Sequence, residues 1–233
     1  MPRPITPHPA DWSMADLLED LGQVSPRRVR MKPAPGTATE KDVTAIQTHE
    51  DRLYELVDGT LVEKVTGYPQ SCLTFFLGGL ISQFVEEHDL GLGAGADGTV
   101  RLMPGLVRIP DISFTSWERL PSREYPREPI PNLTPDLAVE VLSEGNTKGE
   151  MARKLKDYFF AGVRLVWYVD PEKHTVEVYT APDRCTRLGI NDTLDGGDVL
   201  PGFRLPLRRL FARVSKQRRP TRKPTKRNGK RKR

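Results

Sequence analysis

The feature that most constrains this 233-residue chain is an apolar segment that contains one acidic residue, residues 137–142. The order Leu-Ala-Val-Glu-Val-Leu is nearly continuous in apolar character, which is typical of a central strand covered on both faces. Successive side chains of a strand point to opposite faces, so Glu140 points away from the two flanking valines. A carboxylate buried there without a partner would cost several kcal/mol, so Glu140 needs a cation, either a basic side chain or a metal ion. Asp136 begins the strand directly after Pro135, and we interpret it as a turn or hydrogen-bonding residue.

A second acidic residue has a similar apolar setting, 29 residues earlier. Residues 109–114 read Ile-Pro-Asp-Ile-Ser-Phe, and alternation places Asp111 on the face opposite Ile112. If the two strands are neighbours, Asp111 and Glu140 point from one sheet face into the same place. Two close carboxylates repel each other unless a divalent cation lies between them. Such oxygen ligands suit Mg²⁺, with Mn²⁺ as an alternative, although an ion pair with a lysine or arginine would also satisfy each acid.

Two amphipathic helices and three β-hairpins surround these strands. Apolar residues recur at helical spacing over residues 73–85 and 151–159, and Gly91 and Gly162 follow the two helices. Turn residues predict hairpins at three places: Asp58-Gly59 within 53–64, Pro104-Gly105 between 100–103 and 106–116, and Pro171 between 165–169 and 175–179. This order predicts an α/β fold in which a mixed β-sheet is flanked by helices, with an N-terminal β-hairpin.

Basic residues are concentrated at the C-terminus. Residues 216–233 contain 11 Lys or Arg and no Asp or Glu, which leaves 25 basic and 31 acidic residues in the first 215. We expect residues 215–233 to form a disordered basic tail that binds nucleic acid without sequence preference or that only solubilises the chain. Residues 1–41 are rich in proline and are interpreted as a flexible leader and linker with a short helix capped by Ser13. The folded domain is then expected over residues 42–214.

The composition argues against several classes of protein. No run approaches the ~18 apolar residues of a membrane span, and no charged and apolar leader opens the chain. The two cysteines, Cys72 and Cys185, cannot make a disulfide framework or a cysteine-rich zinc site. We therefore expect a cytoplasmic protein that does not interact with membranes.

Several segments together resemble a known family. They are Tyr54-Glu55-Leu56-Val57-Asp58-Gly59, Pro110-Asp111-Ile112-Ser113-Phe114, Pro135-Asp136-Leu137-Ala138-Val139-Glu140-Val141-Leu142-Ser143, Lys154-Leu155-Lys156-Asp157-Tyr158, Trp167-Tyr168-Val169-Asp170-Pro171 and Leu200-Pro201-Gly202-Phe203. In order and spacing they resemble the Uma family of restriction endonucleases, within the PD-(D/E)XK nuclease superfamily. The resemblance covers about residues 40–212 and implies a restriction-endonuclease-like core with Mg²⁺-dependent DNA phosphodiesterase activity.

The resemblance also suggests further site residues. Leu142 stands where the superfamily pattern has a lysine. The Uma family resembles those members of the superfamily in which the lysine has moved to the following helix, which makes Lys154 the candidate. The alternative is that Lys154 is a solvated helix lysine. Gln70 stands where relatives often carry an acidic residue or histidine. Glu55 is the family's other recurrent acid, and it is either a metal ligand or the partner of Lys64.

Two functions follow from these residues. In the first, Asp111 and Glu140 hold Mg²⁺ and Lys154 assists the hydrolysis of DNA as catalytic residue. In the second, the chain is a catalytically weak nucleic-acid-binding module on the same fold, which the leucine at 142 and the neutral Gln70 favour. A homodimer would suit the cleavage of both strands of a duplex.

Overall fold

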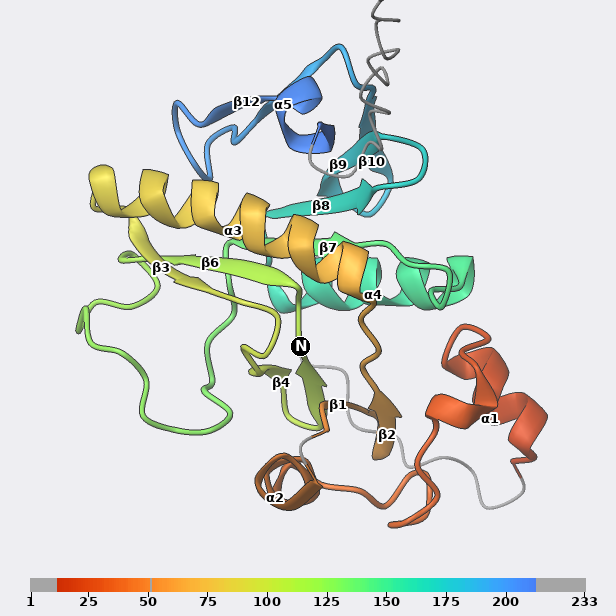
Figure 1. Cartoon of the computed structure of the whole chain (residues 1–233). Coiled ribbons are helices and arrows are strands. Elements are labelled where there is room, and N and C mark those ends of the chain that lie inside the picture. Colours follow the sequence, from red (N-terminus) through yellow and green to blue (C-terminus); the bar gives the residue numbers. More distant parts are fainter. Residues whose placement is uncertain (1–11, 51, 213–233) are drawn as a thin grey trace, which may run out of the picture.

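The computed structural model describes residues 12–50 and 52–212, and the expected basic tail lies outside them. The described chain contains a six-stranded sheet in the order β10-β9-β8-β7-β6-β3, a four-stranded sheet in the order β2-β1-β5-β4 and a two-stranded sheet of β11 and β12 (Figure 1). The strands are β1 (Tyr54–Val57), β2 (Thr60–Glu63), β3 (Gly91–Ala94), β4 (Val100–Met103), β5 (Leu106–Arg108), β6 (Ile112–Ser116), β7 (Leu137–Val141), β8 (Leu165–Asp170), β9 (Thr175–Ala181), β10 (Arg184–Leu188), β11 (Thr193–Asp195) and β12 (Arg204–Pro206). The helices are α1 (Met14–Asp20), the short 3₁₀ helix η1 (Pro26–Arg28), α2 (Glu40–Glu50), α3 (Tyr68–Glu87), α4 (Lys148–Ala161) and α5 (Leu207–Phe211).

The six-stranded sheet is mixed and carries helices on both faces, as the sequence predicts. Strands β7 and β8 are parallel and are joined through α4, whereas the other neighbours are antiparallel. On one face of this sheet, Val139 shares an apolar cluster with Leu73 and Leu77 of α3. Ala138, on the other face, packs with Leu155 of α4. Glu140 alternates with Val139, so it lies on the face that α4 covers.

Helix α4 is also covered from its other side. Its residues share one apolar cluster with α1 and with the four-stranded sheet, in which Leu17, Val62 and Leu102 are buried. Thr147 caps the helix by accepting a hydrogen bond from the Glu150 amide, and Gly162 ends it in the left-handed conformation, with φ at 95°. A side chain on α4 can therefore be buried even where the helix pattern alone would leave it exposed.

The chain crosses from one sheet to the other at Pro110. The sequence predicts one strand over residues 106–116, but the structure divides it into β5 in the four-stranded sheet and β6 in the six-stranded sheet. Proline lacks the amide hydrogen that a ladder requires, which explains the break. Asp111 lies at this junction, and its backbone amide donates to the Val139 carbonyl at 3.0 Å. The three predicted hairpins are confirmed as β1–β2, β4–β5 and β8–β9, the second of them with the shorter strand β5.

The boundary expected at residue 42 is too late. Helix α1 begins after Ser13 with the expected side-chain cap, but residues 25–40 are not a free linker. Val29 forms a β-bridge with Val62, and Leu21 and Val24 are buried against the body. Because these apolar residues lie in a segment rich in proline and charge, they show no periodicity that would reveal their burial. Within the described chain, no helix is both long enough and apolar enough to cross a bilayer.

Candidate active site

Glu140 is buried beside two donors from α4. Its side chain is 6% exposed, and its Oε1 atom lies 3.0 Å from Lys154 Nζ and 2.5 Å from the Tyr158 hydroxyl. Lys154 and Tyr158 are four residues apart on one helix, so both side chains face the sheet. The interpretation of Lys154 as a solvated helix lysine is therefore wrong, because its side chain is 4% exposed. The lysines at 148 and 156 on the same helix are exposed.

Asp111 lies at the start of β6 and faces the same small cavity as Glu140. Its Oδ2 atom accepts a hydrogen bond from the Val141 amide at 2.7 Å, and its Oδ1 atom lies 2.8 Å from Lys64 Nζ. Both carboxylates line this cavity together with Lys64, Gln70 and Lys154. The structure thus brings Asp111, Glu140 and Lys154 to one place, as the sequence analysis expects.

Glu55 pairs with basic residues other than Lys64. Its carboxylate lies 2.9 Å from Lys154 Nζ and 2.8 Å from Arg108 Nη1, and it accepts the Ile109 amide at 3.2 Å. Lys64 pairs with Asp111 instead. Arg108 comes from β5, which pairs with β1 next to Glu55. No signal in the sequence points to Arg108, because it lies 53 positions from Glu55 and nothing local in the sequence joins the two residues.

The pKa values of three buried groups at this site, Glu55, Glu140 and Lys154, are shifted. Burial alone would raise the pKa of Glu55, but Lys154 and Arg108 outweigh this and hold it at about 2. Burial raises the pKa of Glu140. The attraction of Lys154 lowers this pKa and repulsion from Asp111 raises it, and the net effect is a raised pKa. Burial would lower the pKa of Lys154, but the two glutamates outweigh it and raise that pKa. Lys154 is therefore a cation at neutral pH.

The site offers some of the oxygen ligands that a divalent cation needs. Both hydrogen bonds to Glu140 end on Oε1, so within the described residues Oε2 is left for a ligand in the cavity. Two carboxylates beside each other are the oxygen ligands that Mg²⁺ prefers. No cluster of three or more acidic, histidine or cysteine side chains placed to hold a metal occurs in the described chain. Asp111 and Glu140 are thus the two residues that would hold the ion, and the rest of its shell would be water or substrate.

Asp136 has the hydrogen-bonding environment that the sequence analysis favours. It accepts the Ser116 amide at 2.8 Å and lies 2.8 Å from Arg119 Nε and 3.3 Å from Arg164 Nη1. These contacts join the loop after β6 to the start of β7. Asp136 lies at the opposite end of β7 from Val141, whose amide bonds Asp111.

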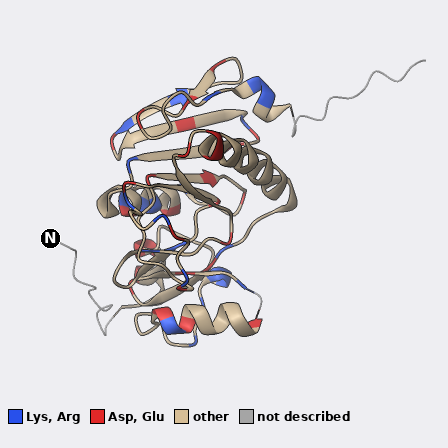
Figure 2. Cartoon of the chain, turned by 90° about the vertical axis from the view of Figure 1, so that its left-hand side faces the viewer, with Lys and Arg blue, Asp and Glu red and all other residues tan. Residues whose placement is uncertain are grey.

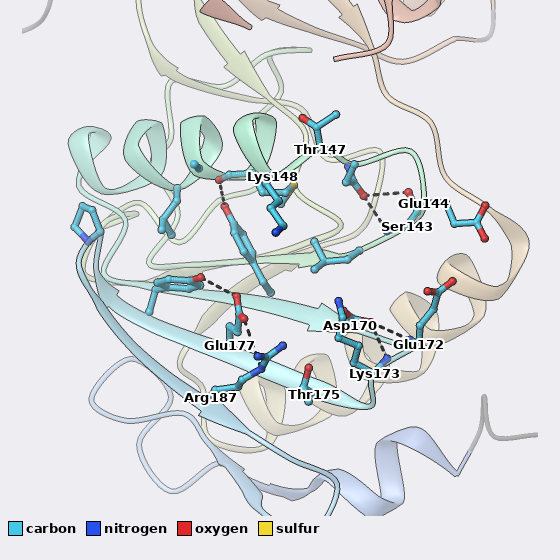
Figure 3. A pocket seen from close by; sticks show the side chains of 18 residues that line it. Ser143, Glu144, Thr147, Lys148, Asp170, Glu172, Lys173, Thr175, Glu177 and Arg187 are labelled. Atoms are coloured by element: carbon cyan, nitrogen blue, oxygen red, sulfur yellow. Dashed lines mark hydrogen bonds and ion pairs between the residues drawn. The ribbon is translucent and has the colours of Figure 1, made fainter. Parts of the chain in front are cut away.

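A wider cleft opens beside the small cavity (Figure 3). It has a volume of about 730 Å³ and lies between the start of α4 and strands β8 and β9. Ser143 and Asn146 line both hollows, and their hydrogen bonds of 2.9 and 3.0 Å hold the loop that separates them. Acidic and basic side chains alternate around the cleft, with Lys173 paired to Asp170 at 2.6 Å. Lys and Arg are likewise mixed with Asp and Glu over the described fold in the view of Figure 2.

Comparisons with known proteins identify the family and the fold of this chain. The family model Uma2, described as "Putative restriction endonuclease", matches residues 19–208. A solved structure, described as a putative nuclease belonging to DUF820 from Anabaena variabilis, superposes with a TM-score of 0.63 at 18% sequence identity, covering 71% of this chain and 93% of its own. At that identity the superposition shows a shared fold. No curated protein matches this chain. Since the family model spans most of the chain, including the segment from residue 19 onward that packs against α4, this chain belongs to the Uma2 family of restriction-endonuclease-like proteins.

Proposed function

We propose that this chain is a metal-dependent endonuclease that hydrolyses DNA phosphodiester bonds, with Asp111, Glu140 and Lys154 as its catalytic residues. The observation that carries the proposal is the small cavity in which two buried carboxylates lie beside an ammonium group. Asp111 and Glu140 would hold Mg²⁺ or Mn²⁺. When bound, the ion would polarise the phosphate and lower the pKa of an attacking water.

The charge of Lys154 decides its role. Its neighbours raise its pKa, so it stays protonated and cannot accept a proton from water. It would instead donate hydrogen bonds and stabilise the negative charge that develops on the phosphate as water adds and the bond to the leaving oxygen breaks. Lys154 would thereby take the place of the lysine that the superfamily carries where this chain has Leu142.

Glu55 would act through Lys154. Its oxygens are engaged by Lys154, Arg108 and the Ile109 amide. We therefore assign Glu55 to holding the ammonium in place and not to binding the metal ion. With Glu140 on its other side, Lys154 has a carboxylate at 2.9 Å and another at 3.0 Å, so its position is fixed before substrate arrives.

A second function is favoured by the charge balance of the site. Four carboxylates, from Glu55, Asp111, Glu140 and Asp157, contact three cations, from Lys64, Arg108 and Lys154. A site whose acidic charge is largely balanced without metal would bind a cation weakly, and a nucleic-acid-binding module on this fold would result. Residues 215–233 would supply affinity for DNA in either case, and a two-fold dimer in the cytoplasm remains part of the proposal.

Cleavage and metal binding distinguish the two functions. Supercoiled plasmid would be incubated with the wild type and with Glu140→Gln, with Mg²⁺, with Mn²⁺ or with EDTA, and metal binding would be measured by titration calorimetry. The endonuclease proposal expects nicking only with metal, and loss of both nicking and metal binding in Glu140→Gln. Tight DNA binding by the wild type without cleavage under any of these conditions would support the binding module instead.

A further inference from the structure

Arg28 reaches the candidate active site from η1, a segment that the sequence analysis expected to be a linker. Its Nη1 and Nη2 atoms donate to the two carboxylate oxygens of Glu150 at 2.9 and 2.7 Å, and its Nε donates to the Glu63 carbonyl at 2.8 Å. The side chains are 11% exposed for Arg28 and 4% for Glu150. Arg28 also lines the cavity that Asp111 and Lys154 share. A two-point contact of this kind fixes both side chains.

Without Arg28, the Glu150 carboxylate would have two alternative partners on its own helix. It is the third residue of α4, and Thr147 caps that helix through the Glu150 amide at 3.0 Å. In a full capping box the glutamate side chain would also return to the cap residue's amide. Glu150 also precedes Lys154 by four residues, which is the favourable order for an ion pair along a helix. Arg28 holds the carboxylate instead, while the Lys154 ammonium bonds Glu140 and Glu55.

We propose that Arg28 is a positioning residue: by occupying both oxygens of Glu150, it prevents Glu150 from drawing the Lys154 ammonium away from Glu140 and Glu55. The effect of Arg28 on catalysis rests on the proposed function. Its effect on the position of Lys154 does not, because that position exists without substrate or metal.

Two variants break the same ion pair but differ in what they release. Arg28→Gln leaves a free carboxylate on Glu150, four residues from Lys154. Glu150→Gln leaves the Arg28 guanidinium with its bond to the Glu63 carbonyl, and a guanidinium has no attraction for an ammonium group. A purely structural role for the pair predicts that both variants disturb the site alike, whereas competition for Lys154 predicts that only Arg28→Gln does. In the double variant the competing carboxylate is gone, so the position of Lys154 is restored.

The direct readout is the side-chain ammonium signal of Lys154 in the full-length protein, observed by NMR and assigned by its absence from Lys154→Ala. The signal should move in Arg28→Gln and stay near its wild-type position in Glu150→Gln and in the double variant. Arg30→Gln is the matched control, because Arg30 makes a similar two-point contact with Glu50, at 2.7 Å for both bonds, in an exposed position. It should leave the signal unchanged.

Cleavage is measured in parallel. Arg28→Gln should lower the rate by about tenfold, the size of coupling seen within one ion-pair network, and the double variant should recover most of it. Equal signal movement in the two single variants, or no movement in Arg28→Gln, would overturn the proposal. If Arg28→Gln does not fold, Arg28→Lys, which loses the two-point contact with Glu150, replaces it, and the signal must move more in Arg28→Lys than in Glu150→Gln. If the signal moves in Arg28→Gln as expected but the wild type cuts no substrate, the proposed function is refuted and the positioning role is left intact.

Discussion

Replacing Glu55 by glutamine should destabilise the protein strongly although it removes only one charge. The carboxylate is 2% exposed and accepts hydrogen bonds from Lys154, Arg108 and the Ile109 amide. Glutamine keeps the shape of the side chain but leaves two buried cations with one partner fewer. Lys154 would retain Glu140, and Arg108 would retain Asp157.

The pKa of Glu55 gives the size of the effect. Its value of about 2 in the folded protein, against the ordinary 4.5, corresponds to about 3 kcal/mol of stability. This agrees with the roughly 3–5 kcal/mol that breaking a buried ion pair costs. Because the folded pKa is the lower one, this stability is fully present above pH 4.5 and is lost as the pH falls from 4.5 towards 2. The wild type and Glu55→Gln should therefore converge in that range.

The measurement is urea unfolding at pH 7, 5, 4 and 3, followed by the fluorescence of the buried Trp167. At pH 7 the variant should be less stable by about 3 kcal/mol, which for a chain of this length lowers the melting temperature by about 6–12 °C. Glu63→Gln is the control, since Glu63 pairs with Arg52 at 3.5 Å on the surface and should cost less than about 1 kcal/mol. A loss at pH 7 no larger than that of the control would refute the assignment of Glu55 to an essential buried ion pair.

Three other variants test the remaining parts of the site. Glu140→Gln should cost far less stability at pH 7 than Glu55→Gln and should stay within about 1 kcal/mol of the wild type. The reason is that the pKa of Glu140 is raised, so folding disfavours its charged form above pH 4.5. A loss of unfolding free energy equal to that of Glu55→Gln would contradict this. Mg²⁺ or Mn²⁺ should raise the melting temperature of the wild type by mass action, and Asp111→Asn should remove most of that rise; an equal rise in both proteins would place the ion elsewhere. Gly22→Ala should lower stability by roughly 2 kcal/mol or more, since Gly22 has φ at 78° and a Cβ there would lie 2.3 Å from the Glu150 amide nitrogen; thermal unfolding equal to the wild type would show that the contact can relax.

Local patterns in the sequence predict the elements that carry the site. Helical spacing identifies α3 and α4, and Asp58-Gly59 identifies the turn between β1 and β2, where both residues have positive φ. Alternation in β7 places Glu140 on the face that α4 covers, which is why Lys154 can be expected to meet it. These predictions succeed because each depends on residues within one helix or one hairpin.

The partners of the buried charges could not be predicted in the same way. Arg108 reaches Glu55 across 53 residues, and Arg28 reaches Glu150 across 122. Such pairs form because two sheets and a helix enclose them, and a single sequence carries no local trace of that packing. The prediction of a linker before residue 42 is wrong for the same reason. Its buried residues, such as Val24 and Val29, are too few and too irregularly spaced to show a pattern.

The central claim is that Lys154 is a catalytic residue beside Asp111 and Glu140. The most direct test is the single-turnover cleavage rate of a labelled DNA duplex with Mg²⁺ or Mn²⁺, compared between Lys154→Ala and Lys156→Ala. Lys156 is exposed on the same helix, two residues away, and serves as the matched control. We predict that Lys154→Ala lowers the rate by about a hundredfold, the usual value of one positioned charge in a closed site, and that Lys156→Ala changes it less than about twofold. Equal rates for the two variants would contradict the claim.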